Sequence, residues 1–234
     1  MNEEMTRKMN EKSFPGIRDL DGGKSIDEAQ ITGMCDFIDS RFDCADFRMV
    51  TILRTLYAYR DLLSAGTVDR IRDTVLGFKY WMDEPGEDTM CYWSENHQLI
   101  FHSCEYLAGQ YYPDEVFANT GMTGRDHMEK ARPKILRWLR YRFSYGFTEF
   151  HSNVYYEEDI APLANLVDFS QDAEMVAKTR IIMDVLFLDM ALHSHRGLFA
   201  AASGRCYEEQ KTDPRRQFTL DMSERLSGYG NIDD

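Results

Sequence analysis

The stretch Cys91-Tyr-Trp-Ser-Glu-Asn-His-Gln-Leu-Ile-Phe-His102 combines polar residues at the start of a predicted helix with an apolar body behind them. Ser94 is a suitable N-cap residue, because its side-chain oxygen can accept a hydrogen bond from the first turn. Residues 99–101 then provide the apolar body. The pattern predicts a helix over residues 94–111, and the polar residues at its N-terminus are a candidate ligand site.

Apolar residues recur at helical spacing on both sides of this stretch. The pattern predicts seven helices and no strand, so the predicted fold class is all-α. The helices are expected over residues 25–39, 45–64, 67–82, 94–111, 125–145, 155–169 and 172–193. Helices of similar length with short connections stack as antiparallel helical hairpins, in a bundle, an α-solenoid or an α/α toroid. No fixed-period repeat of the known solenoid kinds supports the solenoid.

Single residues predict how these helices begin. Ser25 and Glu28 form a capping-box pattern for the first helix. Thr67 and Ser170 are the expected caps of the third and the last helix. The last helix is apolar on most of its circumference, and such a helix is normally buried.

The composition of the 234 residues is that of a soluble protein, with 43% hydrophobic and 29% charged residues. We expect a polar N-terminal arm over residues 1–24, a helical domain over 25–206 and a polar tail over 207–234. No apolar run has membrane-spanning length. The N-terminus lacks an apolar signal region, which favours the cytoplasm, or secretion if the sequence is a piece of a longer exported protein.

The net charge of −13 argues against a nucleic-acid partner, because phosphate binding needs a basic surface. The five cysteines are widely spaced and predict neither a disulfide framework nor a zinc site. His193-Ser-His195 looks like a metal-binding pair, but residues two apart on a helix do not share a face. These histidines are expected to complement the helix dipole instead. No metal or cofactor is expected, and the oligomeric state stays open.

Polar groups at the N-terminus of helix 94–111 are the first candidate site. Trp93 offers a flat apolar face on which a sugar can stack. Asn96 and His97 offer donors at the positive end of the helix, where a carboxylate is stabilised. Glu95 is a candidate general acid or base. The alternative is a plain cap followed by a solvated first turn.

A second aromatic and polar segment, Gly146 to Tyr156, leads into the helix at 155–169. Its candidate site residues are Glu149, His151, Asn153, Tyr155 and Tyr156. A plain loop needs neither so many aromatic rings nor so many hydrogen-bonding side chains. The alternative is a packed loop followed by an acidic first turn.

The two segments together resemble the polysaccharide lyases of the α/α-toroid (six-hairpin) class, the alginate-lyase type above all, over about residues 90–195. In that family an Asn-His pair opens one inner helix, as Asn96-His97 does here. A catalytic Tyr then precedes a Pro-Leu pair by seven residues, as Tyr155 precedes Pro162-Leu163 here. The resemblance implies a partial or reduced α/α toroid, because the sequence predicts fewer helices than a complete one contains.

The resemblance also implies β-elimination at a uronate in a polysaccharide or oligosaccharide substrate. Asn96 and His97 would neutralise the carboxylate, and Tyr155 would act as base, acid or both. The family's Arg, a few residues before the Tyr, is replaced here by His151 and Asn153. Arg205 is the best substitute for that basic group.

Two alternatives stay open. Glycoside hydrolases of the same fold class use paired carboxylates, and Glu95 and Glu149 are then the natural pair. A helical binding domain without catalytic activity is the other alternative, because a fold alone does not decide a function.

Overall fold

The computed structural model describes residue 14 and residues 16–229. It is 63% helical with 3% strand, which confirms the predicted all-α class. Most of the predicted N-terminal arm, residues 1–13 and 15, lies outside the described residues, as do residues 230–234 of the predicted tail. Within the described part, no helix has both the length and the apolar character needed to cross a membrane.

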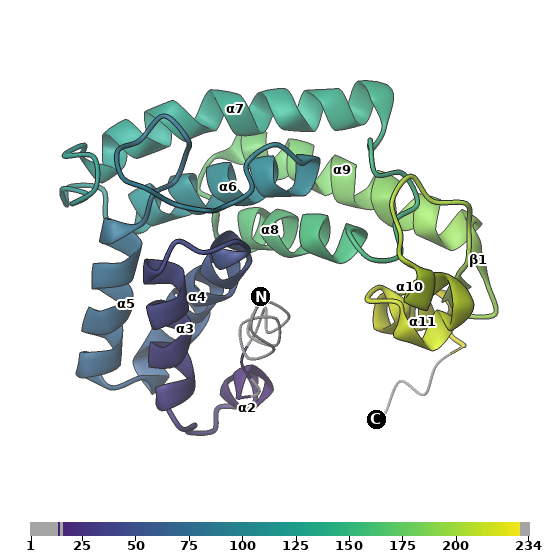
Figure 1. Ribbon diagram of the computed structural model, residues 1–234, viewed down its shortest axis with the longest axis horizontal. Coiled ribbons are helices and arrows are strands. Elements are labelled where there is room, and N and C mark those ends of the chain that lie inside the picture. Colours follow the sequence, from purple (N-terminus) through teal and green to yellow (C-terminus); the bar gives the residue numbers. More distant parts are fainter. Residues whose placement is uncertain (1–13, 15, 230–234) are drawn as a thin grey trace. The chain divides into compact units, whose positions relative to one another are not determined.

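The chain forms two compact units, the first ending at Pro133 and the second beginning at Lys134 (Figure 1). This division differs from the single helical domain expected over residues 25–206. The boundary falls inside helix α7 (Gly124–Tyr145). Each unit is described by itself.

Unit 1 contains the helices that precede α7. These helices are α2 (Ile17–Asp21), α3 (Ala29–Asp39), α4 (Ala45–Tyr59), α5 (Ala65–Gly77) and α6 (Glu95–Tyr111), with a 3-10 turn η1 (Arg60–Leu62) after α4. Helix α4 packs against α3 and α6, and α3 also packs against α5. Their apolar faces supply the core through fully buried side chains such as Ile38, Leu53 and Phe101.

Unit 2 contains two long helices, α8 (Tyr156–Phe169) and α9 (Ala173–Leu192), which pack against each other. They are followed by the strands β1 (Ser194–His195) and β2 (Leu198–Phe199), the helices α10 (Glu208–Thr212) and α11 (Leu220–Ser227), and a 3-10 turn η2 (Pro214–Arg216). Helix α11 packs against α9 and β2, so the predicted polar tail contributes to the unit. Its Met222 contacts the core cluster of Tyr156, Leu186, Met190 and Phe199.

The two strands correct the expectation that the chain has none. They pair antiparallel, with Ser194 opposite Phe199 and His195 opposite Leu198. Arg196 and Gly197 join them, with φ values of 51° and 81°. Positive φ at both central residues is the signature of a tight hairpin turn. Strands of two residues are too short to leave an alternating pattern in the sequence.

The start of α3 corrects the predicted capping box. The Glu28 side chain does not cap its own helix. Its two carboxylate oxygens instead accept hydrogen bonds from Ser64 N, at 2.9 Å, and Ser64 Oγ, at 2.5 Å. Ser64 Oγ accepts a hydrogen bond from Thr67 N, so Ser64 and not Thr67 is the N-cap of α5. Glu28 therefore ties the beginnings of α3 and α5 together.

Of the other two predicted N-caps, one is confirmed and one is wrong. Ser94 is the N-cap of α6 as predicted, and its side chain accepts from His97 N at 3.5 Å. Ser170 does not cap α9. That position belongs to Asp172, whose carboxylate accepts from Met175 N at 3.0 Å. Ser170 Oγ accepts from Asp172 N instead.

Helix α9 is only partly buried, which corrects the expectation for an apolar helix. Met175, Ile182, Leu186 and Met190 line its buried face. A second row of apolar side chains, called here the α9 stripe, is exposed by 44–71%. The α9 stripe consists of Ile181, Val185, Leu188 and Leu192. Both rows are apolar, so the sequence could not show which one faces the core.

A buried ion-pair network lies in unit 1. Lys130 Nζ lies 2.6 Å from Glu84 Oε1 and 3.1 Å from Glu105 Oε1, and both carboxylate side chains are at most 3% exposed. His127 Nδ1 lies 2.8 Å from the same Glu105 oxygen. Burial by itself would lower the pKa of Lys130, but the two carboxylates outweigh it and raise the pKa. Lys130 is therefore a stable cation between two buried anions.

Replacing Lys130 with Met should lower the free energy of unfolding by about 3–5 kcal/mol, because it leaves two buried carboxylates without their cation. Urea denaturation measures the loss. Lys178→Met is the matched control, since Lys178 pairs with Glu174 at the surface, where such pairs contribute at most about 1 kcal/mol. Equal losses in the two variants would contradict the importance of the network.

Two glycines in helices should respond to alanine in opposite directions. A Cβ on Gly109 of α6 would lie 2.3 Å from the carbonyl oxygen of Gly124. Gly109→Ala should therefore cost about 1–3 kcal/mol of stability through overpacking. A Cβ on Gly33 of α3 meets nothing within 4 Å, so Gly33→Ala should stabilise by about 0.5–1 kcal/mol. Thermal unfolding of both variants checks the two signs.

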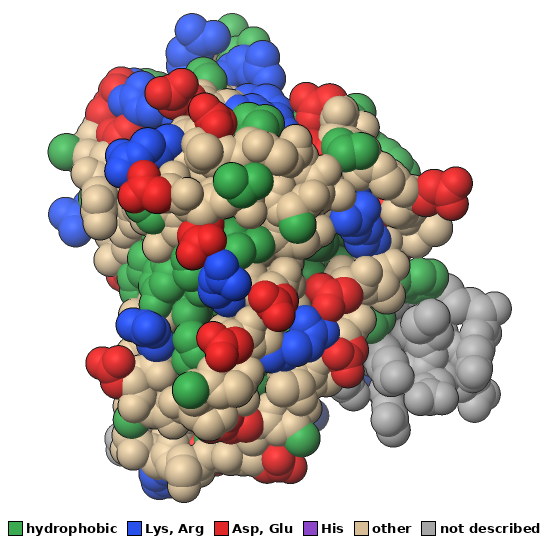
Figure 2. Space-filling view, turned by 90° about the vertical axis from the view of Figure 1, so that its left-hand side faces the viewer, with side chains coloured by type: hydrophobic (Ala, Val, Ile, Leu, Met, Phe, Trp, Pro, Cys, Tyr) green, Lys and Arg blue, Asp and Glu red, His purple; other side chains and the backbone are tan. Residues whose placement is uncertain are grey.

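The charges are interspersed on the face of the molecule shown in Figure 2. Acidic and basic side chains alternate there, with apolar side chains between them. The net charge of −13 is thus not gathered into a single block on this face.

Candidate functional site

The two segments of the predicted site belong to different units. Trp93 to His97 lies in unit 1, and Glu149 to Tyr156 lies in unit 2. A single site built from both segments therefore stays a prediction. The contacts of each segment are described within its own unit.

In unit 1, His97 pairs with a carboxylate on a neighbouring helix. His97 Nδ1 lies 2.5 Å from Asp46 Oδ2 of α4, and the side chains are 8% and 1% exposed. The ring of Phe47 stacks on the imidazole with the centroids 4.8 Å apart. Burial raises the pKa of Asp46, and the neighbouring His97 opposes that rise. A carboxylate that orients an imidazole is a common element of acid–base sites, and the sequence analysis missed Asp46.

The other predicted residues of this segment differ in exposure. Trp93 is 76% exposed, whereas Glu95 and Asn96 are buried. The Asn96 side-chain oxygen contacts Ser94 Oγ. Its buried Nδ2 has no hydrogen-bond partner among the described residues. Trp93 is thus the exposed side chain of this segment, and Asn96 is held inside the protein.

In unit 2, Arg205 joins the predicted residues Glu149 and Tyr155. Arg205 Nη1 donates to Glu149 Oε1 at 2.7 Å, and its guanidinium carbon lies 3.8 Å from the centre of the Tyr155 ring. Arg205 Nη2 also donates to the hydroxyl of Tyr207 at 3.0 Å. The hydroxyls of Tyr155 and Tyr207 contact each other. We call Glu149, Tyr155, Arg205 and Tyr207 the Arg205 cluster.

Ser152 holds the loop before α8, which carries Glu149 and Tyr155 of this cluster. Its buried side chain accepts a hydrogen bond from Tyr155 N at 3.0 Å and donates one to the Arg205 carbonyl oxygen at 2.7 Å. Gly204 N donates to the Phe150 carbonyl at 2.9 Å. The loop before α8 and the segment around Arg205 are therefore connected by side chain and backbone, although they are far apart in sequence.

Asn153 and Tyr156 have structural contacts. The Asn153 carbonyl accepts hydrogen bonds from Phe218 N, at 3.1 Å, and Thr219 Oγ1, at 3.3 Å. Tyr156 belongs to the core of unit 2 and is 1% exposed. Both residues therefore help to position the loop in this structure, while their predicted binding of substrate stays a prediction.

The electrostatics of the Arg205 cluster favour a protonated phenol beside a permanent cation. Burial, with the hydrogen bond to Tyr207, raises the pKa of Tyr155, and Arg205 only partly opposes this. Burial would lower the pKa of Arg205, but Glu149 and Tyr207 outweigh it and raise the pKa. At neutral pH Tyr155 is thus a proton donor.

Asp159, one turn into α8, is a buried acid that the sequence analysis did not single out. It is fully buried, and neither carboxyl oxygen has a hydrogen-bond partner in the described part of the chain. Burial, and then the charge of Glu149, raise the pKa of Asp159 well above its usual value, against the effect of Arg142. These surroundings therefore favour the protonated form of Asp159.

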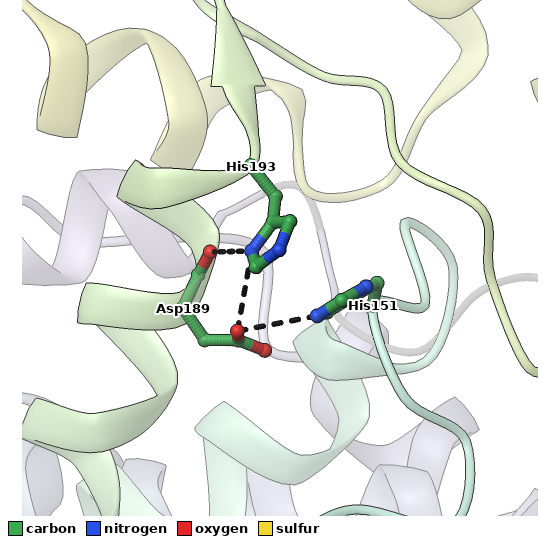
Figure 3. A group of neighbouring side chains, drawn as sticks. All are labelled: His151, Asp189 and His193. Carbon is green, nitrogen blue, oxygen red and sulfur yellow. Dashed lines mark hydrogen bonds and ion pairs between the residues drawn. The ribbon is translucent and has the colours of Figure 1, made fainter.

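The predicted residue His151 belongs to a separate group with Asp189 and His193 (Figure 3). His151 Nε2 and His193 Nδ1 each lie 3.2 Å from Asp189 Oδ1. His193 Nδ1 also lies 2.8 Å from the Asp189 carbonyl oxygen, so it complements the end of α9 as expected. His193 and His195 are neighbours in the sequence, but the ring of His193 packs against that of His151, 42 residues earlier in the chain.

Tyr156 connects this group to the backbone. Its hydroxyl accepts a hydrogen bond from His151 N at 2.8 Å and donates one to Asp189 Oδ2 at 3.3 Å. His151 has a φ of 51°, in the left-handed region that a non-glycine residue rarely adopts. Such conformations persist where the surroundings enforce them, often at functional sites.

Comparison of the chain with known protein families, with curated proteins and with solved structures gave no match. The chemistry of the site is therefore inferred from its geometry and from the resemblance seen in the sequence.

The neighbouring tyrosines Tyr155 and Tyr156 should respond differently to loss of the hydroxyl. Tyr156→Phe leaves the half-buried His151 N–H without its acceptor and Asp189 Oδ2 without its donor, which should cost about 1–3 kcal/mol of stability. Tyr155→Phe should cost less, because its hydroxyl contacts a half-exposed tyrosine. Urea denaturation of both variants measures the difference, and a larger loss for Tyr155→Phe would contradict these roles.

Proposed function

We propose that the protein is a carbohydrate-active enzyme that cleaves an acidic polysaccharide or oligosaccharide by β-elimination at a uronate. The observation that carries this proposal is the contact between the Arg205 guanidinium and the ring of Tyr155. It brings a cation and a phenolic acid together, as the chemistry requires. Arg205 reaches this position from a later part of the chain and substitutes for the Arg that the lyase family has before its Tyr.

Elimination needs three functions. A cation must neutralise the uronate carboxylate, so that the adjacent C5 proton becomes acidic. A base must remove that proton, whose electron pair then forms the C4–C5 double bond as the bond from C4 to the leaving oxygen breaks. An acid must protonate this oxygen.

The Arg205 cluster can supply each function within unit 2. Arg205 is the cation. Tyr155 is the acid, because its raised pKa keeps it protonated. Glu149, held by Arg205 at 2.7 Å, is the carboxylate available as base. Asn96 and His97 remain the residues that the family resemblance assigns to the substrate carboxylate.

A partial α/α toroid is the fold that accompanies this proposal. Its support is that consecutive helices pack against each other, α3 with α4 in unit 1 and α8 with α9 in unit 2. Consecutive helices in contact are what a series of helical hairpins produces.

Hydrolysis is the second candidate, and Asp159 favours it. Glycoside hydrolases pair a protonated acid with an ionised carboxylate. Burial and the charge of Glu149 raise the pKa of Asp159, while Glu149 pairs with Arg205. One carboxyl group is buried and the other is paired with an arginine. Such different environments are typical of a general acid and the ionised carboxylate that acts with it. Glu149 is thus shared by both candidates, whereas Glu95 of the originally expected pair lies in unit 1.

The test incubates the full chain with alginate, hyaluronan, heparin and pectin, and records the ultraviolet absorbance of the unsaturated product together with new reducing ends. β-Elimination predicts that both signals rise. Tyr155→Phe should then lower kcat about 10²–10⁴-fold, and Arg205→Met should do so too. Tyr145→Phe, at an 83% exposed position on α7, should keep full activity.

Two other outcomes contradict elimination, and a third contradicts only the role of Tyr155. Reducing ends without the ultraviolet signal, on these or on neutral glycans, would identify a hydrolase. Binding without any product would identify a helical binding domain. Full lyase activity of Tyr155→Phe would remove the assignment of the phenol.

A further inference from the structure

Two groups of His and carboxylate side chains in the described part of the chain bring their ligand atoms within 4.8 Å of one another. The first is Glu84, Glu105 and His127 of the buried network. Its cation is already present, because Lys130 Nζ contacts both carboxylates. The second is His151, Asp189 and His193, and in the described residues Asp189 has no ion pair with a lysine or an arginine.

We propose that His151, Asp189 and His193 bind a divalent transition-metal ion such as Zn²⁺. Two imidazoles and one carboxylate are a common three-ligand set for this ion. The proposal concerns a site that is separate from the Arg205 cluster, and it holds whether or not the protein acts on a saccharide.

The distances fit a common ion. Asp189 Oδ1 lies 3.2 Å from a ring nitrogen of each histidine. In a tetrahedral zinc site with bonds of about 2.0–2.1 Å, neighbouring ligand atoms are roughly 3.3 Å apart. Two of the three separations therefore already match such a site, and all three ligand atoms lie within 4.8 Å of one another. The hydrogen bond from His193 to the Asp189 carbonyl would be exchanged for the metal bond if Nδ1 is the ligand, and kept if Nε2 is.

The surroundings hold the ligands in place. Tyr156 donates to Asp189 Oδ2, which leaves Oδ1 directed at both imidazoles (Figure 3). Groups behind the ligands that fix a ligand's orientation are typical of metal sites. His151, whose φ is 51°, donates its backbone N–H to the same Tyr156 hydroxyl.

The site is also open enough for an ion to enter. The side chains of His151, Asp189 and His193 are 22%, 32% and 40% exposed. The rings of His151 and His193 lie with their centroids 4.0 Å apart. Two imidazoles this close can both donate lone pairs to one ion. With three protein ligands, a fourth position remains for water.

A bound ion would join the loop before α8 to the end of α9. His151 stands between Glu149 and Tyr155 in that loop, so the ion would restrict the backbone that carries two members of the Arg205 cluster. Its expected role is to order the loop.

The experiment uses the full chain without a polyhistidine tag, after removal of metals with a chelator. Calorimetric titration with Zn²⁺ should show one site, and Co²⁺ should give the visible absorption bands of a protein-bound ion. Zn²⁺ should also raise the midpoint of thermal unfolding, because an ion that binds only the folded state stabilises it.

Variants identify the ligands. His193→Gln changes an exposed residue and should keep the fold, while lowering the affinity for Zn²⁺ at least about 100-fold; Asp189→Asn should do the same. Tyr156→Phe should weaken binding about 10–100-fold. His195→Gln is the control, since His195 is exposed and lies outside the group. Circular dichroism confirms folding of each variant.

Two results would overturn the proposal. One is the absence of Zn²⁺ and Co²⁺ binding to the wild-type chain. The other is equal affinity in the wild type, His193→Gln and Asp189→Asn, as expected if the ion binds elsewhere, for example at the five cysteines, which form no disulfide.

Discussion

In unit 1, the buried carboxylates of Glu84 and Glu105 share the ammonium group of Lys130. A charge in the protein interior is costly unless it is paired, so these residues must meet for the unit to fold. Glu105 comes from α6, Lys130 from α7 and Glu84 from the irregular segment between α5 and α6. A second buried pair, Lys79 with Asp88 at 2.5 Å, holds the same segment. The chain that enters α6 at Ser94 is thus positioned by buried ion pairs together with buried aromatic side chains such as Phe78, Tyr80 and Tyr92.

The sequence predicted the helices well because their apolar residues follow a regular period, which local reasoning detects. It predicted the caps less well, because a cap depends on which partner is near in space. Glu28 fits a capping box in the sequence but binds Ser64, 36 residues away. The burial of α9 was overestimated for a related reason: both of its faces are apolar, and only the packing against α8 and α11 decides which is covered.

The candidate site shows the same limit. Glu149 and Tyr155 were predicted from their types and their positions before a helix, and Arg205 as the substitute for the family's Arg; the structure brings these three together. Tyr207, Asp46 and Asp189 were missed. Each becomes relevant only through a partner about fifty residues away or from a different element, and no periodic pattern marks such a pairing. The motif His193-Ser-His195 drew attention to His193, but in the structure the His193 ring packs against the ring of His151.

The α9 stripe, described above as an uncovered apolar face, has a consequence for the colloidal behaviour of the protein. Contiguous exposed apolar side chains favour association between molecules. The net charge of −13 opposes this, because like-charged molecules repel each other over the Debye length. That length falls from about 8 Å at physiological ionic strength to about 3 Å in 1 M salt. Concentrated salt therefore removes the repulsion while leaving the apolar attraction in place, so the protein is expected to remain dispersed at low ionic strength and to self-associate at high ionic strength.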